Sequence, residues 1–272
     1  MSAPPPDAPG EALLAVEALE MRFGGIVALH EVSFEARRGL ITAVIGPNGA
    51  GKTTLFNCVT GMYRPSGGRV LFRGQDLTRL SPFRIAHVGI ARTFQNLALF
   101  EGLSVRENLL VGAYRHGRSG LLAGALGLPR ARREEARARE RADATLRFLG
   151  LLDIAERRPA ELSYGVQKQV EFARALMGEA RLILLDEPMA GMNAGEKARL
   201  VEIIRDVRDR LGVSFLLVEH DMPVIMGVSD HVVVLDFGRK IAEGPPRAVR
   251  EDPAVIAAYL GADGEALPGE AA

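Results

Sequence analysis

The feature that most constrains this chain is a glycine-rich loop between an apolar run and a predicted helix. The run Leu40–Ile45 leads directly into Gly46-Pro47-Asn48-Gly49-Ala50-Gly51-Lys52-Thr53-Thr54, which has the pattern G-x-x-x-x-G-K-[ST]. We expect a helix over Thr53–Thr60, ending at Gly61. Glycines let several backbone N–H groups turn toward phosphate oxygens, and the helix dipole adds positive potential. The motif therefore predicts a phosphate-binding loop, or P-loop.

The side chains of this loop suit a nucleoside triphosphate held together with magnesium. Lys52 would bring a full charge to the β- and γ-phosphates, and the Thr53 hydroxyl would bind Mg²⁺. The other residues expected at the nucleotide are Gly46, Asn48, Gly49, Ala50, Gly51 and Thr54. The alternative, a chance glycine turn, is disfavoured by the strand before it and the helix after it. A P-loop alone does not separate kinases, GTPases and motors.

A second site follows the apolar run Leu182–Leu185, which ends in Asp186 and Glu187. In P-loop proteins an acid at a strand tip is associated with Mg²⁺, the expected role of Asp186, through water. Glu187 would lie beside the γ-phosphate and polarise the attacking water. Neighbouring residues of a strand point to opposite sides, so the two carboxylates can take different roles. The alternative is a solvated strand end with two ordinary acids.

A histidine follows another predicted strand, Val213–Val218, in the sequence Glu219-His220-Asp221. Open α/β sheets bind ligands at the carboxyl ends of their strands, which places His220 at the same edge as the P-loop. We expect His220 to bond the γ-phosphate and to orient Glu187 and the water. The alternative is a residue beside a helix start with no ligand.

The apolar runs predict an α/β fold. They are near-continuous, which is typical of parallel strands covered by helices on both faces, and they alternate with helical patterns such as Ala194–Leu211. Three further segments are predicted to form antiparallel strands: Leu14–Glu20, Val32–Arg37 and Gly68–Arg73. The region Ser104–Leu162 contains no convincing strand, and Ala131–Phe148 is strongly helical. We interpret that region as an inserted helical subdomain.

Charge and composition narrow the class of protein. Lys+Arg and Asp+Glu are both 34, and a formal charge of zero disfavours a dedicated nucleic-acid or anionic-membrane binder. The Arg-rich segment Arg130–Arg147 is interpreted as a solvated helix face with pairs such as Glu135–Arg139. The single Cys58 excludes an internal disulfide. Neither a membrane span nor a signal peptide is expected.

One further motif makes a resemblance specific. Leu162-Ser163-Tyr164-Gly165-Val166-Gln167 is similar to LSGGQ, the signature of the ATP-binding cassette (ABC) family. The P-loop, the signature, Asp186-Glu187 and His220 match that family in order and spacing, and Gln95, after the predicted strand Ile90–Phe94, matches its Q-loop. The resemblance runs from about residue 12 to residue 245. It implies a P-loop NTPase (RecA-like) core with an antiparallel β subdomain and an inserted α-helical subdomain.

The resemblance also implies how the site works. Two cassettes would pair head to tail, with Ser163 and Gly165 donating to the γ-phosphate on the partner. Gln95 would touch Mg²⁺ and link the site to a membrane partner. Phe23 takes the adenine-stacking position, with a core aromatic as the equal alternative. The sequence departs from the family at Tyr164, at Val166, where Gln is usual, and at Asn193, where Asp is usual; Val166 puts the composite site served by this signature in doubt.

Within the family, the chain resembles the ATP-binding subunits of bacterial branched-chain amino acid importers. The resemblance lies in four stretches and in the long insertion Gly112–Arg133; the stretches are Arg22–Gly25, Arg92–Leu97 with Phe100, Glu187–Asn193, and Asp252–Gly261. It implies an ATPase that uses ATP and Mg²⁺. The implied partners are a second ATP-binding subunit, two transmembrane permease subunits and, indirectly, an extracytoplasmic substrate-binding protein, with no nucleic acid. The implied location is the cytoplasmic face of the inner membrane.

The predicted organisation is one cassette over residues 11–262 between disordered tails, 1–10 and 263–272. Its α/β core comprises 11–95 and 166–245, its helical subdomain 96–165, and its C-terminal helical extension 246–262. Two other functions stay open: a soluble ABC ATPase that remodels a macromolecular complex, and an ABC ATPase of a lipid exporter. The first usually has two cassettes or a coiled coil, and this chain has one cassette and no heptad run. The transported substrate is also open, among branched-chain and other amino acids, amides and urea.

Overall fold

The structure is a computed structural model that describes residues 10–93, 98–113 and 129–263. It divides into two compact units. The first contains residues 1–90, 181–187 and 204–272, and the second contains 91–180 and 188–203. The boundary between the units falls within β6 (Ile90–Thr93) and within α7 (Ala194–Leu211). The domain boundaries expected from the sequence stay a prediction.

An antiparallel sheet forms one layer of the first unit, with strand order β2-β1-β4-β5. Its strands are β1 (Ala12–Phe23), β2 (Ile26–Arg37), β4 (Gly67–Phe72) and β5 (Gln75–Asp76). The three predicted antiparallel strands are confirmed, but β1 and β2 are longer than expected. The excess is the end of a hairpin, where Phe23 pairs with Ile26. Both of these residues are exposed, so apolar patterning does not indicate a strand there.

A second sheet carries the predicted buried strands, in the order β10-β9-β3-β8-β7-β6. Its further strands are β3 (Ile41–Ile45), β7 (Leu182–Asp186), β8 (Ser214–Val218), β9 (His231–Asp236) and the antiparallel β10 (Arg239–Gly244). Every residue of β3, β7 and β8 is buried, which explains their continuous apolar sequences. Strand β8 pairs in parallel with both β3 and β7, so the carboxyl ends of these three strands lie at the same end of the sheet.

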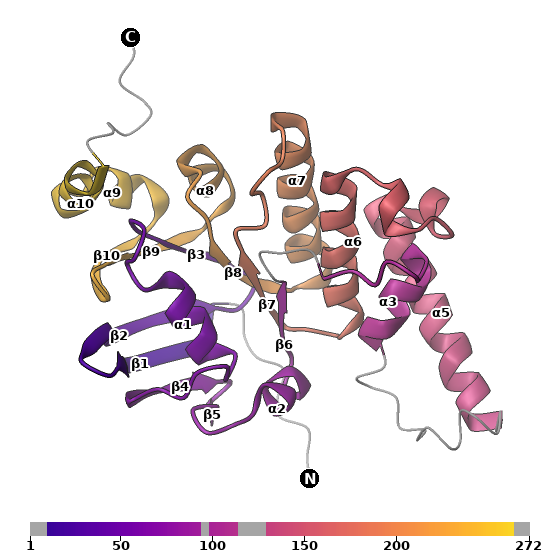
Figure 1. Ribbon diagram of the computed structural model, residues 1–272, viewed down its shortest axis with the longest axis horizontal. Coiled ribbons are helices and arrows are strands. Elements are labelled where there is room, and N and C mark those ends of the chain that lie inside the picture. Colours follow the sequence, from indigo (N-terminus) through magenta and orange to yellow (C-terminus); the bar gives the residue numbers. More distant parts are fainter. Residues whose placement is uncertain (1–9, 94–97, 114–128, 264–272) are drawn as a thin grey trace. The chain divides into compact units, whose positions relative to one another are not determined.

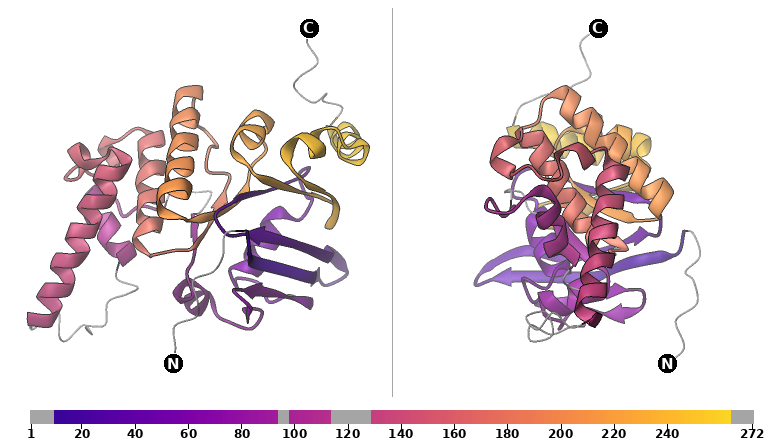
Figure 2. Two further views of the ribbon diagram at one scale, coloured as in Figure 1. Left: turned by 180° about the vertical axis from the view of Figure 1, so that it is seen from behind. Right: turned by 90° about the vertical axis from the view of Figure 1, so that its right-hand side faces the viewer.

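Helices cover both faces of this sheet (Figures 1 and 2). Neighbouring strand residues pack toward opposite faces. Val44 and Val233 pack toward α1 (Lys52–Val59) and the antiparallel sheet. Ile45 and Val234 pack toward the other face, which is covered by α8 (Met222–Val228), α9 (Pro246–Arg250) and α10 (Pro253–Asp263). A short helix, α2 (Pro82–His87), precedes β6. The predicted α/β fold is confirmed.

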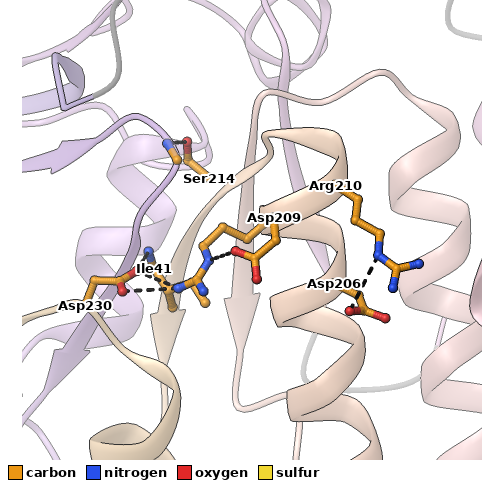
Figure 3. A network of polar contacts seen from close by, with 8 residues as sticks. Ile41, Asp206, Asp209, Arg210, Ser214 and Asp230 are labelled. Carbon is orange, nitrogen blue, oxygen red and sulfur yellow. Dashed lines mark hydrogen bonds and ion pairs between the residues drawn. The ribbon is translucent and has the colours of Figure 1, made fainter.

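Polar contacts fix the other edge of the sheet, where the parallel strands begin (Figure 3). Asp230 accepts a hydrogen bond from the Ile41 N–H at 2.8 Å, and the Arg208 guanidinium bonds the same carboxylate at 3.0 Å. The Ser214 hydroxyl accepts from the Gly39 N–H at 2.8 Å. These bonds join the end of α7 to the starts of β3, β8 and β9. The opposite edge is where the loops with the candidate residues begin.

The second unit is helical, with α3 (Val105–Ala113), α5 (Pro129–Leu149), α6 (Tyr164–Met177) and the 3₁₀ turns η2 (Leu152–Ile154) and η3 (Pro159–Glu161). Helix α5 confirms the predicted helix, and Arg139 bonds Glu135 at 3.0 Å as its spacing suggests. Most of the insertion Gly112–Arg133 lies outside the described residues. Within the described ranges, no helix is long and apolar enough to cross a membrane.

Candidate functional site

The P-loop begins and ends at glycines that no other residue could replace without moving the backbone. Gly46 has φ +148°, and a Cβ there would lie 2.0 Å from the Leu235 carbonyl oxygen. Gly51 has φ +100°, and its Cβ would lie 2.7 Å from the Ala28 carbonyl oxygen. Gly49 also has positive φ but faces open space. The loop is therefore pressed against two other backbone segments and has the open, curled form that phosphate binding needs.

Helix α1 starts at Lys52, one residue earlier than predicted, and Gly51 caps it without a side-chain bond. Its first N–H groups are thus left for a ligand. Lys52 is buried, and its Nζ donates to the carbonyl oxygens of Gly46 at 2.6 Å and Pro47 at 2.9 Å. Thr53 is exposed beside it.

The ammonium group of Lys52 lies in the field of the acidic pair. Burial lowers the pKa of Lys52 because the charged form is desolvated, while the carboxylates of Glu187 and Asp186 act in the opposite direction. A phosphate would add negative charge at the same ammonium group. The structure thus brings Lys52, Asp186 and Glu187 together, as the sequence predicted.

The two acids differ in backbone conformation and burial. Asp186 is the last residue of β7 and is buried. Glu187 has left the strand, with φ +45°, and its N–H donates to the Val218 carbonyl oxygen at 2.9 Å. The expectation that strand alternation separates the two side chains is therefore wrong in its cause. A left-handed residue at the strand end turns Glu187, and such strained residues are enriched at functional sites.

His220 follows β8, whose Val218 pairs with Asp186 of β7. It therefore lies at the predicted edge, one strand away from the acidic pair. The His220 side chain is 68% exposed, and its Nδ1 is 3.8 Å from the carboxylate of Glu219. Glu219 is almost completely buried. Asp221 caps α8 by accepting from the Val224 N–H at 3.3 Å.

Phe23 stands at the end of the β1–β2 hairpin and is 42% exposed, which excludes the core alternative. Its ring packs edge-on against Tyr63, with centroids 5.2 Å apart. The hairpin approaches the P-loop through Ala28, whose carbonyl oxygen lies against Gly51. The structure thus shows an exposed aromatic side chain at the end of the hairpin whose second strand contacts the loop.

The signature lies in the second unit, at the start of α6. Ser163 caps this helix and accepts from the Val166 N–H at 3.4 Å, so α6 begins within the signature, at Tyr164. Gly165 is buried, and a Cβ there would lie 2.4 Å from the Glu196 carboxylate. The Tyr164 ring lies beside Gly191, in the loop after the acidic pair. The signature and that loop therefore contact each other.

Two contacts with the P-loop were not predicted. The turn between β9 and β10 has positive φ at Phe237 and Gly238, and the Gly238 N–H donates to the Ala50 carbonyl oxygen at 3.1 Å. The sequence signal was a glycine between two strand patterns. Tyr259 of α10 forms a hydrogen bond with the Gly46 backbone. In the sequence, Tyr259 is marked only by its place in the stretch Asp252–Gly261, which resembles the importer subunits.

The oxygen donors of Thr53 and Asp186 are of the kind that Mg²⁺ prefers, and Mg²⁺ sites usually combine one or two such side chains with substrate phosphates. The described residues therefore fit the predicted metal. They contain no cluster of three or more His, Cys, Asp or Glu side chains suited to a metal ion. Gln95, the other predicted ligand, lies outside the described residues.

Comparison with known proteins adds named relatives. A family model described as ABC transporter matches residues 29–190, and one described as branched-chain amino acid ATP-binding cassette transporter matches residues 239–265. The high-affinity branched-chain amino acid transport ATP-binding protein LivG of Salmonella typhimurium is 44% identical over 251 residues, 92% of this chain and 98% of that protein. BraF of Pseudomonas aeruginosa, with the same description, is 43% identical over 249 residues, 92% of this chain and 98% of its own.

A solved structure agrees. The ADP conformation of an ATP-binding cassette of an ABC transporter superposes with a TM-score of 0.80 at 35% identity, covering 92% of this chain and 99% of that one. The predicted resemblance is therefore confirmed. The P-loop, the acidic pair and the signature agree with these comparisons, and the chain belongs to the ABC transporter family.

Proposed function

We propose that this chain is the ATP-hydrolysing subunit of a membrane importer for branched-chain or related amino acids. The observation that supports ATP hydrolysis is the arrangement of the P-loop. The buried Lys52 donates to a P-loop carbonyl oxygen and lies in the electrostatic field of the Asp186 and Glu187 carboxylates. The transport part is supported by LivG and BraF, which match nearly their whole length, and by the C-terminal match at residues 239–265.

Each candidate site residue of the first unit has a proposed role. Lys52, the P-loop N–H groups and the start of α1 bind and neutralise the phosphates. Thr53 and Asp186 hold Mg²⁺, which would supply positive charge at the phosphate oxygens. Glu187 polarises the attacking water, and His220 bonds the γ-phosphate and orients Glu187. The half-exposed ring of Phe23 stacks on the adenine.

Ser163 and Gly165 act on the nucleotide of a partner cassette. Ser163 is exposed at the N-terminus of α6, where the helix dipole favours an anion. Gln95 would connect the nucleotide to a membrane subunit. The proposed assembly has a second ATP-binding subunit and two permease subunits at the cytoplasmic face of the inner membrane, served by an extracytoplasmic substrate-binding protein.

A Glu187→Gln variant tests the catalytic assignment. Removing the acid takes away the group that polarises water but leaves the P-loop intact, so nucleotide binding should be retained. The steady-state ATPase rate should fall by about 10²-fold or more. Measured with the purified protein and with Lys52→Ala as the non-binding comparison, an unchanged ATPase rate in Glu187→Gln would remove Glu187 from its proposed role.

The same variant tests the assembly. Tagged Glu187→Gln protein, isolated from detergent-treated membranes with Mg-ATP, should hold the closed complex. Mass spectrometry should identify two multi-span proteins and a second cassette chain, and Lys52→Ala should recover fewer of them. Recovery of ribosomal or DNA-bound proteins, with nothing from the membrane, would support the remodelling ATPase instead.

A further inference from the structure

The C-terminal helix α10 places a tyrosine against the first residue of the P-loop. Tyr259 packs on a buried cluster that includes Ile45 of β3 and Val234 of β9. Its hydroxyl oxygen accepts a hydrogen bond from the Gly46 N–H, the direction in which a backbone bond lowers the pKa of a phenol. The side chain thus crosses from the helix layer to the strand end at which the phosphate loop begins.

Gly46 is a residue whose exact placement matters. Its carbonyl oxygen accepts from Lys52 Nζ at 2.6 Å, so a shift of the Gly46 backbone moves the acceptor of the phosphate-binding lysine. The Gly46 backbone is also packed closely against β9, because a Cβ added at this residue would lie 2.0 Å from the Leu235 carbonyl oxygen. The phenol of Tyr259 and the ammonium of Lys52 therefore both bond the backbone of one residue.

The phenol remains a neutral partner of the Gly46 N–H. Burial raises the pKa of Tyr259 to about 12, although the bond with the Gly46 backbone acts in the opposite direction. The hydroxyl is consequently protonated at neutral pH. Loss of this hydroxyl would leave the buried Gly46 backbone short of a partner, which weakens the conformation that depends on it.

We propose that Tyr259 is a positioning residue for nucleotide binding: by accepting from the Gly46 N–H, it holds the Gly46 backbone in the conformation that Lys52 and the phosphates require. This inference rests on the proposed nucleotide-binding function of the P-loop. It makes α10 a part of the nucleotide site, and it gives a physical role to the C-terminal segment matched by the branched-chain family model.

A Tyr259→Phe variant tests the proposal because it removes the hydroxyl and keeps the ring. The dissociation constant of Mg-ADP should rise by about 3- to 10-fold, as expected for one hydrogen bond, and the Tm without nucleotide should fall by no more than a few degrees. Isothermal titration calorimetry and thermal unfolding of the full chain measure the two quantities.

Val255→Ala is the matched control. Val255 lies one helical turn earlier on α10, is 1% exposed and belongs to the same buried cluster. Its truncation should lower the Tm by several degrees through a core cavity. The affinity for Mg-ADP, measured well below the Tm, should stay at the wild-type value.

Four results would decide whether Tyr259 has this positioning role. Weaker binding in Tyr259→Phe, with a loss of Tm no larger than that of Val255→Ala, supports it. Equal binding in Tyr259→Phe and wild type overturns it, as does a loss of affinity in Val255→Ala that is as large. Failure of folded wild-type protein to bind Mg-ADP would instead contradict the proposed function of the P-loop.

Discussion

The P-loop and the signature are both glycine-containing turns that open a helix, but different atoms constrain them. In the P-loop, Gly46 and Gly51 face the backbone carbonyl oxygens of two strands, β9 and β2. In the signature, Gly165 faces the carboxylate of Glu196, the far end of a flexible side chain. A backbone atom cannot move aside without shifting a whole strand, whereas a carboxylate can rotate. The comparison teaches that the first loop is fixed by the fold and the second by one side chain.

The N-caps of the two helices that follow these loops, α1 and α6, also differ. Gly51 caps α1 in a left-handed conformation with no side-chain bond, so the helix N–H groups stay available. Ser163 caps α6 and accepts from the Val166 N–H. Glu196 is itself held by Asn193, whose N–H donates to it at 3.1 Å. The signature can thus carry unusual residues such as Tyr164 and Val166 without losing its helix start.

Gly46→Ala should have the largest effect. The new Cβ meets the Leu235 carbonyl oxygen, and the backbone conformation at φ +148° disfavours any L residue. We expect a loss of stability of more than about 1 kcal/mol and a loss of detectable nucleotide binding. Urea unfolding and calorimetry with Mg-ADP measure both. Wild-type stability in this variant would mean that the backbone does not constrain the loop.

Lys52→Met should abolish binding without lowering stability. Burial lowers the pKa of Lys52, so the folded state disfavours its charge at neutral pH. The sign follows from linkage: between the folded pKa and the unfolded value near 10.5, the unfolded chain binds more protons and wild-type stability rises with pH. Methionine removes this cost, so its Tm at pH 7 should equal or exceed that of wild type.

Thermal unfolding at pH 7 and pH 10, with and without Mg-ADP, tests this. The wild-type protein should gain stability relative to Lys52→Met as the pH rises, and only the wild type should be stabilised by Mg-ADP. A Tm several degrees lower in Lys52→Met at pH 7 would show that the bonds to Gly46 and Pro47 outweigh desolvation.

Gly165→Ala should destabilise the protein less than Gly46→Ala, because the new Cβ meets the Glu196 side chain, which can move at the cost of its bond with the Asn193 N–H. We expect a loss of stability of about 1 kcal/mol, and the double variant with Glu196→Ala should recover most of it. Urea unfolding of the two single variants and the double variant forms the cycle. Additive losses would contradict a side-chain constraint on Gly165.

Val166→Gln should have the smallest effect and tests what the signature still contributes. It restores the usual family residue and one hydrogen-bonding group near the partner's nucleotide. We expect an ATPase rate about 2- to 5-fold higher, within the range of one hydrogen bond, and an unchanged Tm. A rate equal to that of wild type, in the presence of the partner cassette, would show that this position is neutral here.

Much of the fold could be predicted because apolar patterning reports burial. The strands β3, β7 and β8 are buried along their whole length, so their sequences have no polar interruption. The ends of β1 and β2 escaped prediction because Phe23 and Ile26 are exposed. Hairpin pairing alone extends the strands there, and a local sequence pattern does not contain it.

The residues and contacts of the site were likewise predictable only in part. Lys52, Asp186 and Glu187 were predictable because short motifs place them at strand ends of one sheet. The left-handed turn of Glu187 was not, since no glycine marks it. The contacts of Gly238 and Tyr259 with the P-loop join residues far apart in the chain, and only the assembled fold brings them together.

The β9–β10 turn offers a spectroscopic handle on the nucleotide site. Phe237 is 87% exposed, and its neighbour Gly238 bonds Ala50 within the P-loop. The chain contains no tryptophan. A Phe237→Trp variant would therefore have a single indole fluorophore one residue from the loop, on a side chain that the core does not need. Its emission could follow nucleotide binding in real time, without a label on the ligand.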